Sequence, residues 1–331
     1  MYEKLNIAQD AAHRPEQQAA LLALLRAVQP ELDAVVNDFI TRFYDELLSQ
    51  PRFSRVLGLL SETEFAQLRK NQERHLRSLF AGRSAASVHV ARHVGRAHAL
   101  IGIDASWLVE SYGLYTRLLI AHFAGWVDPT ERADLLGYFF LRLQEELQWQ
   151  IEGHEDIGRQ LDGALARIDS AILTAHTLSD LLRSVLGALE NIEGVVAGTL
   201  GRPDAAGVLQ FEHAFGSRFK SLYLDRIGAS GVAPTVVRGD VAEGLGASGR
   251  AWRSRQVQFT ASYSSDPAIL PWKALAHELG VRSAVSIPIL DAFGQPIALM
   301  DLYSSYPGFF TNAARKVFIE HLQKILGLAF T

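Results

Sequence analysis

The spacing of apolar residues divides this chain into two parts that cannot share one fold. Up to about residue 190, apolar side chains recur at helical spacing and no strand-like alternation is found. From about residue 195, short apolar runs separated by Gly, Pro and Asp indicate strands joined by turns. A length of 331 residues is sufficient for two domains, each with its own core. The pattern therefore predicts an all-α domain followed by an α+β domain.

Composition and charge exclude several classes of function. The formal net charge of −4 gives no electrostatic case for binding nucleic acid or an anionic membrane surface. No apolar run approaches the roughly 20 residues that a membrane-spanning helix needs. The first residues, MYEKLNIAQDAAHRPEQQ, lack the layout of a secretory signal, so we expect a cytoplasmic protein. The chain has no Cys, which excludes disulfides, iron–sulfur clusters and thiolate metal sites.

Prolines, glycines and capping residues indicate where the helices of the first part begin and end. One helix is expected over residues 16–29, ending before Pro30, and an amphipathic one from Leu32 to Leu48, ending near Pro51. The capping box Ser61-Glu-Thr-Glu64 opens a third helix, which Gly82 is expected to close. Three further helices are expected over 84–100, 104–126 and 130–155. Helices of such unequal length favour globin-like packing over a simple four-helix bundle.

The histidines near residue 95 fall on two faces of their predicted helix. At 100° per residue, His89 and His93 share a polar stripe with Arg92 and Arg96. His98 instead shares a stripe with four apolar residues: Val90, Ala91, Val94 and Ile101. An imidazole on an apolar face suits the proximal ligand of a haem iron, and it equally suits a hydrogen-bonded core histidine. Because the only thioethers are Met1 and Met300, a haem iron in this chain would need His or Tyr.

Several fixed spacings within residues 30–155 point to one family. They are Phe43-Tyr44, then Leu68…Gln72…His75…Leu79-Phe80, and Val94-Gly95…His98…Ile101-Gly102-Ile103…Trp107…Tyr112-Gly…Tyr115. This region resembles the sensor globin of the globin-coupled sensors, bacterial haem proteins that report oxygen.

The resemblance implies a haem b cofactor and a role for each matching residue. His98 corresponds to the proximal iron ligand, Tyr44 to a distal residue that hydrogen-bonds bound gas, and Leu68 to an apolar distal residue. Three further residues are expected to line the pocket: Phe43, Val94 and Ile101. The resemblance also implies O₂ as ligand, with CO or NO as alternatives, and a homodimer formed by the last globin helices and the linker. Taken alone, Tyr44 also fits a core tyrosine bonded to a backbone carbonyl.

Other conspicuous side chains have structural interpretations. His75 lies on a different helix from His98 and is expected to be structural. Trp107, Tyr112 and Tyr115 have near-helical spacing, which favours core packing over contact with a ligand. His154-Glu155 faintly resembles a kinase phosphoacceptor, but no ATP-binding motif follows it.

The segment after residue 155 is expected to link the two domains. The polar run 153–158 is expected to loosen the helix. Apolar residues then recur at spacings of 4-3-4-3: Leu161, Leu165, Ile168, Ile172 and Ala175. This spacing indicates either a short coiled-coil seam between two chains or one helix packed onto its own domain. Thr177-Leu-Ser-Asp180 then predicts the cap of a new helix.

The second part shows strand and turn signals throughout. Strands are expected over 195–200, 208–211, 257–259, 283–290 and 296–303, followed by a helix over 312–328. Several motifs in this part have a characteristic spacing: Glu243-Gly-Leu-Gly-Ala-Ser-Gly-Arg-Ala-Trp252, Asp266-Pro267, Pro271-Trp272, Gly280-Val-Arg-Ser283, Ile287-Pro288, Gly294 and Leu302-Tyr303-Ser304. Residues 160–331 are thereby similar to the GAF family, which implies a six-stranded antiparallel sheet flanked by helices. Gly244 and Gly246 are interpreted as turn glycines, because a phosphate-binding loop would carry a Lys.

These observations predict three segments: a sensor globin over 1–155, a helical linker over 156–176 and a GAF domain over 177–331. The expected function is a cytoplasmic haem-based O₂ sensor and signal transducer without catalytic activity, acting through a separate output protein. One alternative is a haem-free globin-like stress regulator, and another is the sensory part of a diguanylate cyclase whose output domain is absent from this chain. Enzymatic turnover of O₂ or NO is disfavoured because no flavin- or dinucleotide-binding motif is found.

Overall fold

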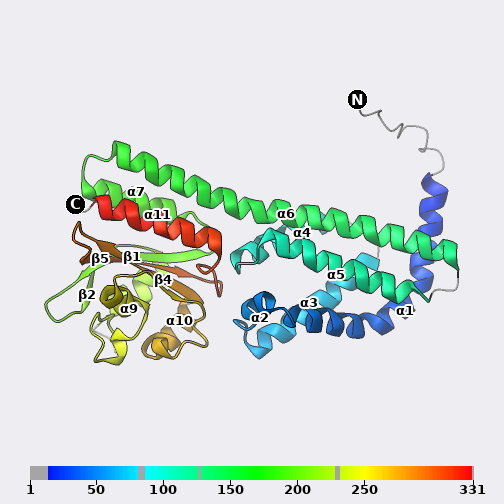
Figure 1. Ribbon diagram of the computed structural model, residues 1–331, viewed down its shortest axis with the longest axis horizontal. Helices are drawn as coiled ribbons and strands as arrows, with labels where there is room; N and C mark the ends of the chain where they lie inside the picture. The colour runs from blue at the N-terminus through cyan, green and yellow to red at the C-terminus, as the bar shows by residue number, and fades with distance from the viewer. Residues whose placement is uncertain (1–13, 81–85, 126–127, 228–231, 330–331) are drawn as a thin grey trace. The chain divides into compact units, whose positions relative to one another are not determined.

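The computed structural model describes residues 14–80, 86–125, 128–227 and 232–329 (Figure 1). These residues form two compact units. The first unit comprises the chain up to Leu57 together with Glu62–His93 and Ala105–Ile151. The second comprises Gly58–Ser61, Val94–Asp104 and Glu152–Thr331. None of the described helices is long and apolar enough to cross a membrane.

The first unit is entirely helical, as its periodicity predicts. Its helices are α1 (Arg14–Leu48), α2 (Pro51–Leu57), α3 (Glu62–Phe80), the first half of α4 (Ala86–Leu100), α5 (Ala105–Phe123) and the start of α6 (Pro129–Thr174). Residues from α1, α2, α3, α5 and α6 share one hydrophobic core, in which Val36, Ile40 and Phe123 are fully buried. The predicted start at the Ser61 capping box is confirmed, whereas Gly82 lies outside the described residues.

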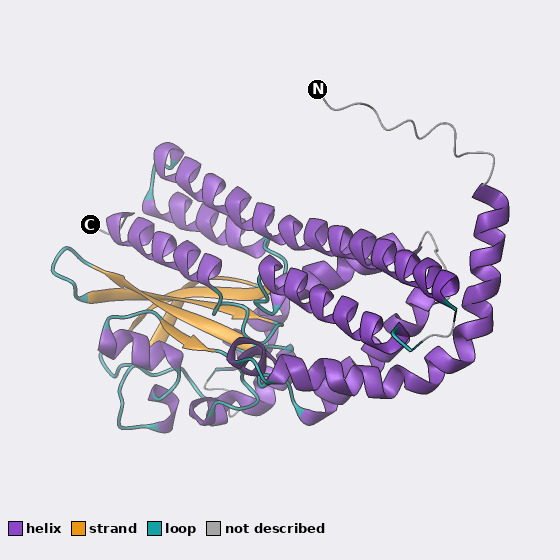
Figure 2. Ribbon diagram, turned by 45° about the vertical axis from the view of Figure 1, so that its right-hand side comes forward, coloured by secondary structure: helices purple, strands orange, loops and turns teal. Residues whose placement is uncertain are grey.

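The predicted helix end before Pro30 is wrong, because α1 is one helix that contains this proline. Proline inside a helix removes a backbone hydrogen bond and costs about 3 kcal/mol. Leu25 and Val28 before it and Leu32 after it are all buried in the same core. Burial of such side chains contributes roughly 1.5–3 kcal/mol each, which offsets the cost of the proline. Figure 2 shows that α1 bends along its length, as a proline in a helix causes.

The helix α6 does not loosen at residues 153–158, contrary to the prediction. It continues through Gly153 and Gly158 to Thr174. Each glycine costs only about 1 kcal/mol in a helix interior, and Ile157 between them is buried in the core of the second unit. Further along, Ile168 is fully buried in that same core, while Ile172 is 43% exposed. Of the two interpretations of the 4-3-4-3 spacing, the structure therefore favours a helix packed onto its own domain.

The second unit contains a five-stranded antiparallel sheet with strand order β2-β1-β5-β4-β3. The strands are β1 (Val195–Pro203), β2 (Leu209–Phe215), β3 (Gln258–Thr260), β4 (Ser283–Leu290) and β5 (Pro296–Ser304). The helices α7 (Leu178–Glu190) and α11 (Ala313–Ala329) cover one face. On the other face lie α9 (Ala247–Ser254) and α10 (Lys273–Leu279), as Figure 1 shows.

Alternation along the central strands decides which side chains each layer buries. Val285, Met300 and Leu302 point toward α7 and α11 and form the main core. Ala284, Asp301 and Tyr303 consequently point to the opposite face of the sheet. The predicted cap of α7 is confirmed, because the Thr177 hydroxyl accepts a hydrogen bond from the Asp180 backbone N–H at 3.1 Å.

The sheet differs from the expected one in strand number and in one turn. The described residues form five strands rather than six, and Val236 makes only an isolated bridge to Val208. The strands β1 and β2 form a hairpin, in which β1 continues to Pro203, three residues beyond its predicted end, before the chain turns. The turn is displaced because the Asp204 carboxylate accepts hydrogen bonds from the backbone N–H groups of Ala206 and Val208 at 2.9 and 3.0 Å.

Candidate functional site

His98 is half-buried near the C-terminal end of α4. The two histidines predicted on the opposite face, His89 and His93, are exposed. Val94 and Ile101, predicted to share the stripe of His98, are half-buried as well. The inclusion of Val90 in a buried stripe is wrong, because its side chain is 55% exposed. Val90 lies about 80° around the helix from His98 and so marks the edge of the apolar face.

The backbone immediately after His98 ends α4 in an ordered turn within the second unit. Ile103 N–H donates to the His98 carbonyl at 3.0 Å, and Gly102 N–H donates to the Ala99 carbonyl at 3.1 Å. Gly102 adopts a φ of +84°, a conformation that glycine takes without steric cost. His154 of α6 contacts the Ile103 carbonyl through Nε2 at 2.8 Å, so its role is structural.

A buried arginine of the last helix contacts the same turn. The guanidinium of Arg315, in α11, donates to the Ala99 carbonyl at 2.7 Å, to the Phe309 carbonyl at 2.7 Å and to the Leu100 carbonyl at 3.5 Å. Arg315 is only 2% exposed, and burial lowers the pKa of its guanidinium to about 9, with Asp104 opposing the shift. Its charge stabilises the negative end of the α4 dipole. The two residues that follow His98 thus accept hydrogen bonds directly from a side chain of α11.

A second arginine, Arg96, lies on the same helix as His98 and ties that helix to two other parts of the second unit. Arg96 forms ion pairs with Asp156 of α6, at 3.3 Å, and with Glu193, which precedes β1. The hydrogen bond to Glu193 raises the pKa of the Arg96 guanidinium further. Residues 94–104 therefore belong structurally to the second unit, through contacts on both sides of His98.

The distal candidates meet in the core of the first unit. Tyr44 of α1 is 4% exposed, and its ring packs edge-on against Phe43 and Phe65 with centroid distances of 5.4 and 5.3 Å. Leu68 of α3 is partly buried against this cluster. Burial raises the pKa of the Tyr44 hydroxyl well above its ordinary value, with Arg69 opposing the shift. Like an unperturbed tyrosine, Tyr44 is protonated at neutral pH and can donate a hydrogen bond.

The predicted site residues are therefore distributed between the two units. Tyr44, Phe43 and Leu68 gather in one hydrophobic cluster of the first unit. His98, Val94 and Ile101 belong to the segment 94–104 of the second unit.

The three aromatic residues expected in the core do pack there. Tyr115 is 4% exposed, its ring centroid lies 4.4 Å from that of Phe43, and Tyr112 and Trp107 pack against the same core. His75 pairs with the buried Glu146 at 3.0 Å, which confirms its structural role.

Arg315 is not among the site residues predicted from the sequence, although the spacing of apolar residues around it holds a signal. Arg315 lies three and four residues before Phe318 and Ile319, both of which are buried in the core. That spacing places it on the apolar face of α11. A charged residue on such a face needs polar partners, and here they are backbone carbonyls from another part of the chain.

The donor atoms of the described residues suit a metal held by a porphyrin. Among these residues no group of three or more His, Cys, Asp or Glu is placed to hold a metal ion. Met300, the thioether in the described range, is fully buried in β5. A haem iron needs one protein ligand, and a half-buried histidine next to the apolar Val94 and Ile101 satisfies this requirement.

Comparison with known families assigns both parts of the chain. A family model described as Protoglobin matches residues 17–158, and one described as GAF domain matches residues 175–330. No curated protein matches the chain.

Solved structures resemble each part separately. The globin domain of the Geobacter sulfurreducens globin-coupled sensor is 19% identical and covers 43% of this chain and 97% of its own, with a TM-score of 0.37. The free methionine-R-sulfoxide reductase of Neisseria meningitidis is 17% identical and covers 51% and 87%, with a TM-score of 0.39. The Nlh2 GAF domain of A. aeolicus is 12% identical and covers 53% and 97%, with a TM-score of 0.40.

Proposed function

Because the chain belongs to the protoglobin family in its first part and to the GAF-domain family in its second, we propose that it is a haem-based gas sensor. Both families are sensory rather than catalytic, and His98 is the observation that carries the proposal. It is a half-buried imidazole on an apolar helix face, and the turn after it is bonded to the GAF domain. Haem would supply an iron that binds O₂, CO or NO.

Each residue of the candidate site has a defined task in this proposal. His98 would hold the iron of haem b through an imidazole nitrogen. The Tyr44 hydroxyl, which is protonated at neutral pH, would donate a hydrogen bond to the bound gas. A hydrogen-bond donor of this kind would favour O₂ over CO, which is why we propose O₂ as the ligand. The apolar walls that exclude water would come from Leu68, Phe43, Val94 and Ile101.

The signal would pass from His98 to the GAF domain through the end of α4. A ligand changes the output only if the two states of the protein bind that ligand with different affinity. A shift of α4 would change the hydrogen bonds from Arg315 to the carbonyls of Ala99 and Leu100. Because Arg315 is buried, an altered bond there leaves a donor or an acceptor unsatisfied, and the resulting free-energy difference couples the two sites.

We test the cofactor by absorption spectroscopy of the full chain after supplementation with haem. The wild-type chain is expected to show a Soret band that shifts with CO, and His98→Ala is expected to lose the band or its ligand response. His93→Ala removes an exposed imidazole from the same helix and should leave the spectrum unchanged. A wild-type chain that stays colourless would contradict the proposal and favour the haem-free regulator.

A further inference from the structure

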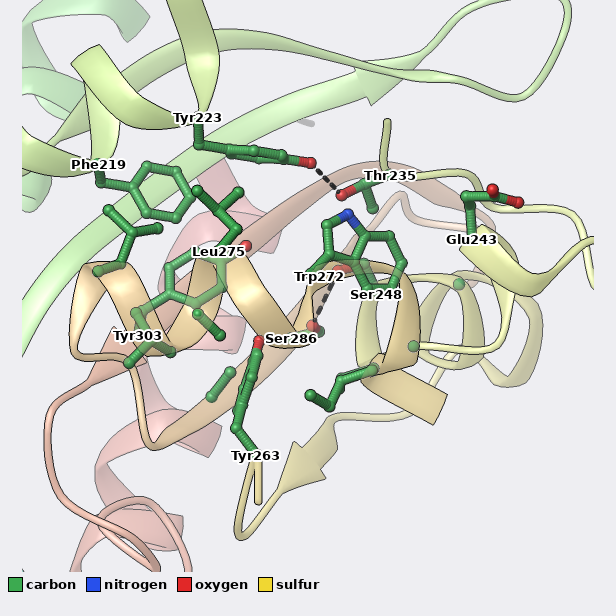
Figure 3. A pocket seen from close by; sticks show the side chains of 18 residues that line it. Phe219, Tyr223, Thr235, Glu243, Ser248, Tyr263, Trp272, Leu275, Ser286 and Tyr303 are labelled. Carbon is green, nitrogen blue, oxygen red and sulfur yellow. Dashed lines mark hydrogen bonds between the residues drawn. The ribbon is translucent and has the colours of Figure 1, made fainter. Parts of the chain in front are cut away.

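A cavity of about 60 Å³ lies within the GAF domain, on the face of the sheet that α9 and α10 cover (Figure 3). Five aromatic residues line it: Phe219, Tyr223, Tyr263, Trp272 and Tyr303. The polar atoms of two rings are already bonded within the protein. Tyr223 Oη lies 2.8 Å from Thr235 Oγ1, and Trp272 Nε1 donates to the Ala233 carbonyl at 2.9 Å. These residues therefore offer mainly their π faces to a ligand.

The charge at this cavity has one sign. Among the described residues that line it, Glu243 is the only charged side chain, and none is Lys, Arg or His. The other polar side chains of the lining are the hydroxyls of Ser248, Ser286, Thr235 and the tyrosines. An anionic ligand would find no compensating cation here.

A second carboxylate lies behind the two serines. Asp301 pairs with Ser286 across β5 and β4, and it precedes Tyr303 by two residues, so its side chain points to the same face of the sheet. Its Oδ1 accepts a hydrogen bond from Ser248 Oγ at 3.0 Å, and the two serine hydroxyls lie 3.3 Å apart. Asp301 is 1% exposed, and its Oδ2 has no hydrogen-bond partner among the residues that the structure describes.

An unpaired carboxylate oxygen is costly to bury, because it has lost its water and gained no donor. Burial accordingly raises the pKa of Asp301 to about 6, while the hydroxyls of Ser286 and Ser248 oppose the shift. A positive charge bound in front of the serines would stabilise the ionised carboxylate. Aromatic rings stabilise the same charge through their π faces.

We propose that the GAF pocket binds a small organic cation, a protonated amine that carries a compact apolar group. The charged nitrogen would face Ser248, Ser286 and Glu243, and the apolar group would pack against the aromatic wall. This inference is independent of haem binding, because every residue in it lies in the GAF domain. A neutral ligand would leave the Asp301 oxygen without a counter-charge, and an anion would be repelled.

We test the proposal with three probes that share one alkyl group: isobutylammonium, isobutanol and isovalerate. Binding to the full chain is measured by ligand-observed NMR titration at pH 7.5 and constant ionic strength. The cation is expected to bind about tenfold more tightly than the alcohol, which is the size of a cation–π contribution combined with a partly buried charge. Isovalerate is expected not to bind. A parallel titration with benzylammonium and benzyl alcohol checks that the preference follows charge rather than the alkyl group.

Substitutions then locate the charge that is recognised. Glu243→Gln and Asp301→Asn should each weaken binding of isobutylammonium severalfold and leave isobutanol unchanged. Glu278→Gln makes the same charge change on an exposed position of α10, outside the pocket, and should have no effect. Should Asp301→Asn fail to fold, Glu243→Gln still decides the question. Equal affinity for cation and alcohol, binding of isovalerate, or no binding of either ammonium probe would overturn the proposal.

Discussion

At Asp301, burial and ionisation oppose each other, and the stability of the GAF domain should depend on pH as a result. The folded state raises the pKa of this carboxyl from 3.8 to about 6, so the folded state holds the proton more tightly than the unfolded chain does. The free energy of unfolding should therefore fall as pH rises from about 4 to about 6, by about 3 kcal/mol if Asp301 acts alone. Above pH 6 the loss is complete.

Urea unfolding of Asp301→Asn and of the wild type at pH 4.5, 5.5, 6.5 and 7.5 isolates this contribution. The variant cannot ionise, so its free energy of unfolding relative to that of the wild type should rise between pH 4.5 and about 6 and then stay constant. Glu278→Gln serves as the control and should follow the wild-type profile. Parallel profiles for Asp301→Asn and wild type would show that the carboxyl ionises in the folded state as easily as in the unfolded one.

The proposed hydrogen bond from Tyr44 to bound O₂ can be tested by removing a single oxygen atom. Tyr44→Phe keeps the ring contacts with Phe43 and Phe65 and removes only the hydroxyl. One hydrogen bond of about 1–1.5 kcal/mol corresponds to roughly tenfold faster O₂ dissociation, with little change for CO. Stopped-flow displacement measures both rates. Tyr138→Phe removes a hydroxyl that donates to the Leu79 carbonyl in the same unit, and it should leave both rates unchanged. An equal effect of Tyr44→Phe on O₂ and CO would remove Tyr44 from the site.

At the scale of elements, Arg315 is expected to make α11 respond to the state of His98. Arg315→Met keeps most of the side-chain volume and leaves the carbonyls of Ala99, Leu100 and Phe309 without this donor. We expect a loss of unfolding free energy of roughly 3 kcal/mol, with the haem spectrum retained. In hydrogen exchange, the wild-type α11 should change its protection when CO binds, and the variant should not. Arg159→Met, at an exposed position of α6, is the control, and persistence of the CO response in Arg315→Met would exclude this path.

The sequence predicts best those elements whose own residues, without distant partners, decide which side chains are buried. The strands β4 and β5 alternate strictly between two buried faces, and the structure confirms them at or within one residue of the predicted bounds. The helix end predicted before Pro30 is wrong because burial of Leu25 and Leu32 in one core outweighs the helix-breaking effect of the proline. The loosening predicted for the polar run 153–158 is wrong for the same reason, because Ile157 is buried in the core of the second unit.

The candidate site is predictable only in part. The family spacing selects His98 and Tyr44, and their roles stay predictions. Arg315 and Asp301 are different, because the partners that allow them to be buried come from distant segments. Two of the three carbonyls that Arg315 contacts, those of Leu100 and Ala99, lie 215 and 216 positions before it in the sequence. No local periodicity reports such a partner.

For the whole molecule, the expected homodimer has a candidate surface on the last globin helices. Ile120 of α5 and Phe140 and Leu141 of α6 are 52%, 48% and 62% exposed, although each is a large apolar residue. Exposed apolar side chains on neighbouring helices are typical of a surface that another chain covers. Leu141→Glu should therefore convert the dimer to a monomer, because it would bury two symmetry-related charges in an apolar interface. Light scattering coupled to size-exclusion chromatography measures the mass directly. Leu270→Glu makes the same change at a 72% exposed position of the GAF domain and should leave the dimer intact. A wild-type chain that elutes as a monomer at high concentration would contradict the predicted assembly, and a dimer that survives Leu141→Glu would move the interface to another face.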